Sequence, residues 1–98
     1  MNEPYQISCS QSVLETVRFL RKQCRYRGLE SRFFTALRKI ESRLKSEPLI
    51  FGEPRFHLHS LGLEIRIGMI QPLVVWYGIH AENRVVFVRD FKLFPSWN

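Results

Sequence analysis

The chain has 98 residues, of which 45% are hydrophobic and 24% are charged, which excludes two separate cores and an intrinsically disordered chain. We expect a single domain over residues 1–98. The net charge of +6 at pH 7 favours partners with phosphate groups or acidic surfaces. Residues 1–50 hold ten Lys and Arg against five Asp and Glu, and residues 51–98 hold five against four. The excess positive charge therefore belongs mainly to the N-terminal half.

The cysteines and the lengths of the apolar runs indicate the cellular compartment. Cys9 and Cys24 are too few for a disulfide framework and lack the spacing of metal ligands, so we expect reduced thiols. The N-terminus has no positive region followed by an apolar run, and no stretch reaches the ~20 apolar residues of a membrane span. These features predict a soluble, cytoplasmic protein with no membrane role.

A short strand over residues 5–9 and two helices are predicted in the first half of the chain. Ser12 and Glu15 form a capping-box pattern, which predicts a helix start near Ser12, and Gly28 predicts its end. Pro48 marks the end of the second helix. Each helix has an apolar stripe with steps of four, three and four residues. The stripes are Val13, Val17, Leu20 and Cys24, then Phe33, Leu37, Ile40 and Leu44.

Strands are predicted after a loop near Pro54. Residues 63–69 alternate apolar and polar side chains, which indicates a strand with its apolar face buried and its polar face outward. Residues 73–79 are almost wholly apolar and indicate a central strand. A turn and a third strand over 85–91 follow, antiparallel to it. The pattern predicts an α+β fold in which a helical hairpin packs on an antiparallel sheet.

This order of elements resembles the RelE/ParE superfamily of bacterial toxins. The likeness is carried by LGLEIRIG at 61–68, LVVWYGI at 73–79 and VVFV at 85–88. These look like the family's arginine-bearing strand, its V-x-Y central strand and its last core strand. The resemblance implies a RelE-like fold, β-α-α-β-β-β(-β), with a twisted antiparallel sheet. It also implies the toxin of a type II toxin–antitoxin module.

The resemblance further implies an activity and partners. Members of the nuclease branch are mRNA interferases, metal-independent endoribonucleases without a cofactor that cleave messenger RNA on the ribosome. Cations on the concave sheet face hold the phosphate backbone and stabilise negative charge there. The partners implied are a cognate antitoxin, the ribosome and its messenger RNA, with an oligomer bridged by the antitoxin.

Arg66 matches the family's basic position on its strand, and the alternative for it is a solvated side chain or an ion pair with a nearby carboxylate. Arg55, His57 and His59 alternate along an extended segment, so we expect them to share one face near the groove. Histidine there can serve as a general acid or base. Arg66, His59 and Arg55 are thus the expected catalytic residues, and a solvated polar face is the alternative for the last two. Two histidines without a third ligand predict no metal site.

Other side chains are expected to bind nucleic acid or to fill the core. The expected nucleic-acid contacts are His57, Arg89 and Lys92, with Arg18, Lys22 and Arg25 on the first helix. A pair with Asp90 or Glu64 is the alternative for Arg89. Trp76 can stack on a base, although a tryptophan in so apolar a strand more often fills space under a helix.

Three departures from the nuclease branch weaken the prediction of cleavage. Glu64 stands at a basic position of that branch, and Leu73-Val74 replaces an arginine. Near the chain end, Phe94, Pro95, Ser96 and Trp97 stand where that branch has arginine and tyrosine. The alternatives are a ParE-like inhibitor of DNA gyrase and a catalytically silent relative that binds nucleic acid or protein.

Overall fold

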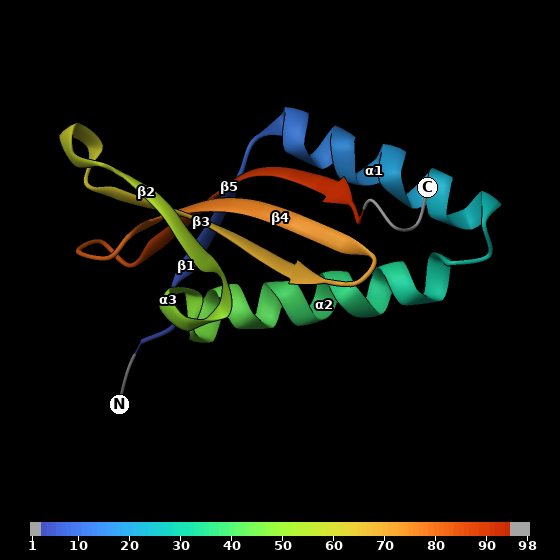
Figure 1. Cartoon of the computed structure of the whole chain (residues 1–98), viewed down its shortest axis with the longest axis horizontal. Coiled ribbons are helices and arrows are strands. Elements are labelled where there is room, and N and C mark those ends of the chain that lie inside the picture. Colours follow the sequence, from blue (N-terminus) through green and yellow to red (C-terminus); the bar gives the residue numbers. More distant parts are fainter. Residues whose placement is uncertain (1–2, 95–98) are drawn as a thin grey trace.

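The computed structural model describes residues 3–94 and contains one five-stranded sheet (Figure 1). The strands lie in the order β1-β5-β4-β3-β2. They are β1 (Gln6–Cys9), β2 (Glu53–Leu58), β3 (Leu63–Ile70), β4 (Leu73–His80) and β5 (Val85–Leu93). The helices are α1 (Gln11–Tyr26), α2 (Glu30–Ser46) and the single turn α3 (Pro48–Phe51), and a 3-10 turn spans His59–Leu61. The α+β class is confirmed.

The sheet is mixed, not antiparallel as predicted. β2, β3, β4 and β5 form an antiparallel ladder, but β1 runs parallel to β5, with Gln6 opposite Val85. Strands joined by a short turn must be antiparallel, whereas β1 and β5 are separated by most of the chain. Their relative direction is set by packing, which the local pattern does not contain.

The ends of the helices differ slightly from the sequence prediction. Ser10, not Ser12, caps α1, because its Oγ accepts a hydrogen bond from the N–H of Val13 at 3.3 Å. Gly28 adopts a φ of 71° in the turn between the helices, as its predicted role as a helix terminator requires. α2 ends before Pro48, as predicted, and Pro48 then opens the single turn α3. Pro54, which was expected in a loop, lies in β2.

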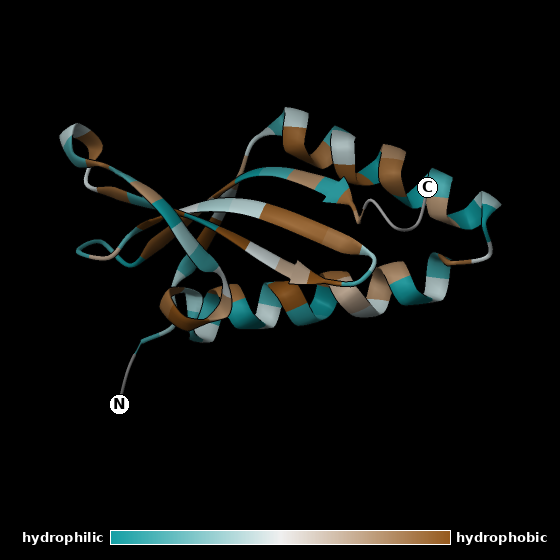
Figure 2. Cartoon of the chain, in the orientation of Figure 1, coloured by the Kyte–Doolittle hydropathy of each residue, from teal (hydrophilic) through white to brown (hydrophobic). Residues whose placement is uncertain are grey.

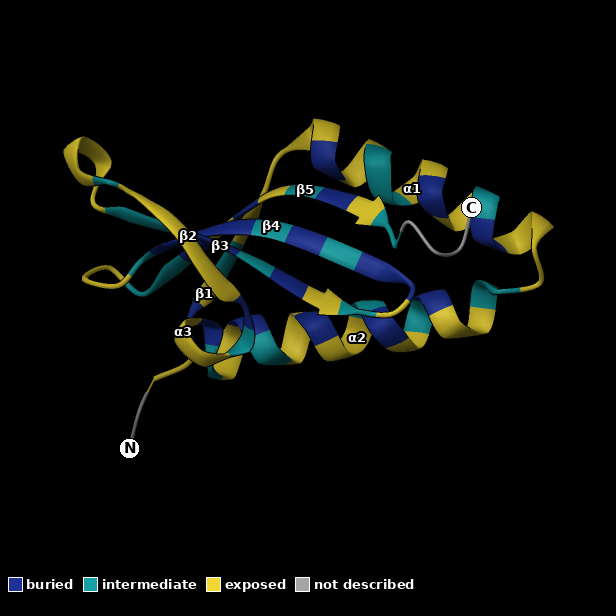
Figure 3. Ribbon diagram, in the orientation of Figure 1, coloured by how far each residue is buried: buried dark blue, intermediate teal, exposed yellow. Residues whose placement is uncertain are grey.

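Both long helices cover one face of the sheet. The predicted stripes are confirmed: six of their eight residues are buried, and Val17 and Leu37 are partly buried against the same cluster. β4 and β5 supply Leu73, Val75, Tyr77, Ile79, Val86, Val88 and Phe91 to this core. Figure 2 shows apolar residues on the sides of the helices that face the sheet, and Figure 3 shows exposed residues on their outer sides. No helix within residues 3–94 has the length and apolar character needed to cross a membrane.

The two faces of β3 are reversed relative to the prediction. Arg66 lies opposite Tyr77 in the ladder, so its side chain is on the core face, whereas Ile65 lies on the other face and is not part of the helix-covered core. Gly68 explains part of the reversal. A Cβ at Gly68 would overlap the Phe51 ring, so this glycine leaves room for that ring beneath the sheet edge. The apolar residues of β3 therefore face the side without helices.

Candidate functional site

The sheet face opposite the helices carries a hollow of about 370 Å³. Four neighbouring strands supply its lining, which is Phe56, Ile65, Trp76, Arg89, Asp90 and Lys92. Ile65 has no exposed surface, whereas Phe56 is 48% exposed. Trp76 is half-buried and does not lie under a helix, because its strand neighbours Val75 and Tyr77 face the helical core. The hollow thus combines aromatic surface with charged groups.

A β-bulge in β5 brings two charged residues to this face. Val88 and Phe91 are both buried in the core although three positions separate them, whereas strict alternation would put them on opposite faces. The register between β4 and β5 shifts next to Trp76, which gives β5 one extra residue. Arg89 and Asp90 occupy the places between the two core residues, so both lie on the side away from the helices.

The charged groups of the hollow are not neutralised by one another. Within residues 3–94, neither Arg89 nor Lys92 has an ion-pair partner, so the predicted alternative of an Arg89–Asp90 pair is not present. Asp90 accepts a hydrogen bond through Oδ1 from the N–H of Phe91 at 2.9 Å. The hollow therefore offers two cations to an anionic ligand and one carboxylate oxygen, Oδ2, for which no protein partner is described.

Arg66 does not line this hollow, contrary to the sequence prediction. It is 8% exposed, on the core face of β3. Its Nε and Nη2 donate to the carbonyl oxygen of Gly52 at 3.1 and 2.5 Å, and its Nη1 lies 2.7 Å from Glu64 Oε2. All three guanidinium nitrogens have partners inside the protein. The ion-pair alternative is the arrangement that the structure shows.

Glu64 joins His57 to Arg66. Its Oε1 lies 3.3 Å from His57 Nε2, and its Oε2 holds Arg66. The rings of His57 and His59 stack, with their centroids 5.4 Å apart and their planes at 13°. The structure therefore brings His57, His59 and Arg66 into one row. This row lies on the sheet face opposite the hollow. Phe56 precedes His57 in β2 and lines the hollow instead, because successive strand residues point to opposite faces.

Arg55 does not share the face of the two histidines. The register of β2 against β3 shifts between Pro54 and Phe56, which makes Arg55 the bulged residue. Its side chain lines a separate hollow with Glu53 and Met69. The expectation that Arg55, His57 and His59 alternate on one face is wrong, because the bulge breaks the alternation at one end and β2 stops before His59 at the other.

The cations of α1 lie on the helical side of the molecule, away from the hollow. Arg25 Nη2 and Arg21 Nε bind Glu30 Oε2 at 3.0 and 3.2 Å, and these hydrogen bonds lower the pKa of Glu30. Arg18 and Lys22 are exposed and have no carboxylate partner within residues 3–94. None of the three expected α1 contacts belongs to the same surface as Arg89 and Lys92.

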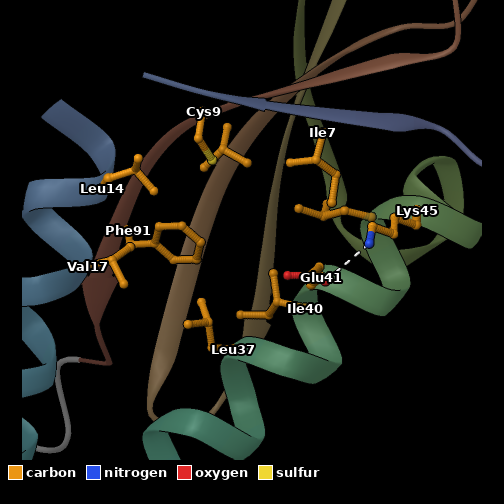
Figure 4. Close-up of a pocket in the computed structure, with 11 residues that line it drawn as sticks. Ile7, Cys9, Leu14, Val17, Leu37, Ile40, Glu41, Lys45 and Phe91 are labelled. Carbon is orange, nitrogen blue, oxygen red and sulfur yellow. Dashed lines mark hydrogen bonds and ion pairs between the residues drawn. The ribbon is translucent and has the colours of Figure 1, made fainter. Parts of the chain in front are cut away.

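An apolar groove of about 380 Å³ separates the two long helices. Figure 4 shows Leu14 and Val17 of α1 facing Leu37 and Ile40 of α2 across it, with Phe91 between them. At its rim, Lys45 Nζ donates to Glu41 Oε1 at 3.2 Å. The lining also includes Ile7, Cys9, Leu44 and Val88. Partial burial in this groove, and then the charge of Glu41, raise the pKa of the Cys9 thiol, which makes it a poor nucleophile.

Sequence reasoning missed three residues of the hollow. Phe56 and Asp90 gave no signal on their own, because bulges in β2 and β5 decide which face they occupy. Ile65 was expected on the face covered by the helices, and the structure reverses the two faces of β3. Pro95, Ser96 and Trp97 lie outside the described residues. Within residues 3–94, no group of three or more His, Cys, Asp or Glu is placed to hold a metal ion.

Comparison with models of protein families, with curated proteins and with solved structures finds no significant match for this chain.

Proposed function

We propose that the chain is the toxin of a type II toxin–antitoxin module of the RelE/ParE kind and that it acts on messenger RNA during translation. The observation that carries the proposal is the hollow in the helix-free sheet face. It sets two aromatic rings, Phe56 and Trp76, beside two cations without ion-pair partners in residues 3–94, Arg89 and Lys92. Single-stranded RNA is bound by such combinations, because bases stack on aromatic rings while phosphates bind cations.

The order of elements supports the same proposal. One strand, two long basic helices and four further strands follow the order of the superfamily that the sequence resembles. The sheet face opposite the helices is where that superfamily holds its RNA. The hollow lies on this face, although the residues that line it differ from those expected from the sequence.

The charges of the hollow suit cleavage by the ribose 2′-hydroxyl. In this mechanism Asp90 removes the 2′-hydroxyl proton, and the 2′-oxygen then forms a bond to the adjacent phosphorus. The bond from phosphorus to the 5′-oxygen breaks, and that oxygen takes a proton from water. Arg89 and Lys92 stabilise the negative charge that builds up on the phosphoryl oxygens. The products are a 2′,3′-cyclic phosphate and a 5′-hydroxyl end.

One observation favours a second candidate, a silent RNA-binding relative. Arg66, the one position carried over from the nuclease branch, is held by Gly52 and Glu64 and does not face the RNA surface. In this second case the hollow binds RNA without cutting it. The two candidates share the binding surface and differ only in the role of Asp90.

The antitoxin is proposed to cover the apolar groove between α1 and α2. Its walls are apolar and its surroundings are basic, with Arg18 and Arg38 exposed on the two helices. An amphipathic helix with an acidic outer face would bury its apolar side there and pair with these cations. Leu14 is 42% exposed at this groove and would become buried.

The test compares matched variants in a translating extract. The wild-type chain is expected to cut a reporter messenger RNA and to leave cyclic phosphate ends. Asp90→Asn should bind RNA but not cut it, whereas Arg55→Gln, which removes an exposed cation outside the hollow, should cut normally. Wild-type binding without cleavage would select the silent relative. Growth arrest that is accompanied by DNA damage while translation stays intact would select a gyrase inhibitor. A chain that neither binds RNA nor arrests growth would overturn the proposal.

A further inference from the structure

The outer face of α2 carries a row of four short hydroxyl side chains. The row is Ser31, Thr35, Ser42 and Ser46. Its steps of four, seven and four residues keep it on one face of the helix, and all four residues are exposed. Figure 3 shows exposed residues on the side of α2 that is turned away from the sheet. The row forms a low strip, because none of its side chains extends beyond a single hydroxyl group.

Two of these hydroxyl protons are already used inside the helix. Thr35 Oγ1 donates to the carbonyl oxygen of Ser31 at 3.0 Å, and Ser46 Oγ donates to that of Ser42 at 2.8 Å. A hydroxyl oxygen can still accept hydrogen bonds when its proton is engaged. At Thr35 and Ser46 the strip therefore presents acceptors, which suit a ligand that donates. Phosphate oxygens are acceptors and gain nothing from them.

Two cations flank the strip, one on each side. Arg38 and Lys39 are consecutive, so they project about 100° apart around the helix axis, with the hydroxyl row between them. Both are exposed, and neither has an ion-pair partner within residues 3–94. The carboxylates near α2 are each bound by a basic residue. The pairs are Glu30 with Arg21 and Arg25, Glu41 with Lys45, and Glu47 with Arg43. The cations on the outer face of α2 that have no ion-pair partner within residues 3–94 are therefore Arg38 and Lys39, near the middle of the helix.

We propose that the outer face of α2 binds the minor groove of an A-form RNA duplex. That groove is wide and shallow, displays ribose 2′-hydroxyl groups and has a phosphate backbone along each edge. The 2′-hydroxyls donate to the hydroxyl oxygens of Thr35 and Ser46, and Arg38 and Lys39 each contact one backbone. DNA lacks the 2′-hydroxyl, so the strip selects RNA. This surface is separate from the hollow proposed for single-stranded RNA, which lies on the other side of the sheet.

The experiment measures fluorescence anisotropy of a labelled RNA hairpin duplex and of a DNA hairpin with the same sequence, using the full chain at several salt concentrations. The RNA should bind at least about tenfold more tightly than the DNA. The double variant Arg38→Gln/Lys39→Gln should weaken RNA binding by about tenfold and reduce the salt slope, by roughly 0.9 for each phosphate that it no longer neutralises. Thr35→Val/Ser46→Ala should bring the RNA and DNA affinities together without changing that slope.

Two further variants separate this surface from others. Arg18→Gln/Lys22→Gln removes the same charge from α1 and should weaken duplex binding by less than about threefold. Arg89→Gln/Lys92→Gln alters the hollow. It should weaken single-stranded RNA binding and leave duplex binding unchanged. The proposal for the hollow and the proposal for the α2 face can therefore fail separately. Circular dichroism checks that each variant folds. Equal affinity for RNA and DNA, or an equal loss in the α1 variant, would overturn the proposal.

Discussion

Arg66 donates two hydrogen bonds to the carbonyl oxygen of Gly52, from Nε at 3.1 Å and from Nη2 at 2.5 Å. The N–H of the same glycine donates to Tyr77 Oη at 2.9 Å, and that hydroxyl donates to the carbonyl oxygen of Pro48 at 2.7 Å. Both polar groups of Gly52 are thus satisfied by side chains from β3 and β4. These bonds hold the turn after α3 against the sheet. β2 begins directly after this turn.

Arg66→Ala is expected to lower the free energy of unfolding by about 2–4 kcal/mol, because it leaves Gly52 O and the Glu64 carboxylate without their buried partner. Urea denaturation monitored by circular dichroism measures the loss. Arg55→Ala is the matched control, and its effect should stay within about 0.5 kcal/mol since Arg55 is exposed. If Arg66→Ala keeps wild-type stability but loses activity, the result would contradict this structural role and support the catalytic role expected from the sequence.

Tyr77→Phe is expected to cost about 1–3 kcal/mol at neutral pH, because two buried backbone groups lose their partner. Burial also raises the pKa of Tyr77 above its ordinary value near 10. The folded state then holds this proton more tightly than the unfolded chain, so the contribution is complete below about pH 10 and is lost as pH rises further. Urea midpoints at pH 9 and pH 11 test this, and Tyr77→Phe should lose less than the wild type between them. An equal loss in both proteins would contradict it.

Gly52→Ala is expected to destabilise the fold by about 2–4 kcal/mol. An added Cβ would lie 2.7 Å from both the Ile67 carbonyl oxygen and Tyr77 Oη, and the backbone atom cannot move aside cheaply. Gly28→Ala is the comparison, because it meets no neighbouring atom and bears only the strain of its φ of 71°. Its cost should be about 1–2 kcal/mol. Thermal unfolding of both variants checks the order, and an equal or reversed order would show that the turn accommodates a Cβ.

The sequence predicts the helical layer well and the sheet faces poorly. The stripes that contain Val13 and Phe33 follow the 3.6-residue period, which depends only on neighbouring residues. The parallel pairing of Gln6 with Val85 depends on contacts between distant segments, which no local pattern encodes. On β3, alternation identified two faces but not which one the helices cover. A buried arginine with internal partners reversed the expected assignment.

The candidate site was predicted only in part, for a related reason. Arg89 and Lys92 were expected to bind nucleic acid, and the structure puts both in the hollow. Asp90 joins them only because a bulge adds one residue to β5, and a bulge leaves no reliable mark in a single sequence. Arg66 was assigned to the groove because its side chain was expected to point the other way.

Trp76 gives a direct spectroscopic test of stacking in the hollow. In a Trp97→Phe background, Trp76 is the remaining tryptophan of the two in the sequence. Adding a short single-stranded RNA should quench its fluorescence by stacking with a base. Quenching should saturate with the same midpoint as binding measured by anisotropy. A binding signal without any quenching would place the RNA elsewhere on the chain.

The most direct test of the central claim measures the affinity for a short single-stranded RNA by anisotropy. Arg89→Gln/Lys92→Gln and Arg18→Gln/Lys22→Gln each remove two positive charges, the first from the hollow and the second from α1. The hollow variant should bind at least about tenfold more weakly than the wild type, while the α1 variant should stay within about threefold. Equal losses would show that net charge alone attracts RNA, and would contradict the assignment of the hollow as the RNA site.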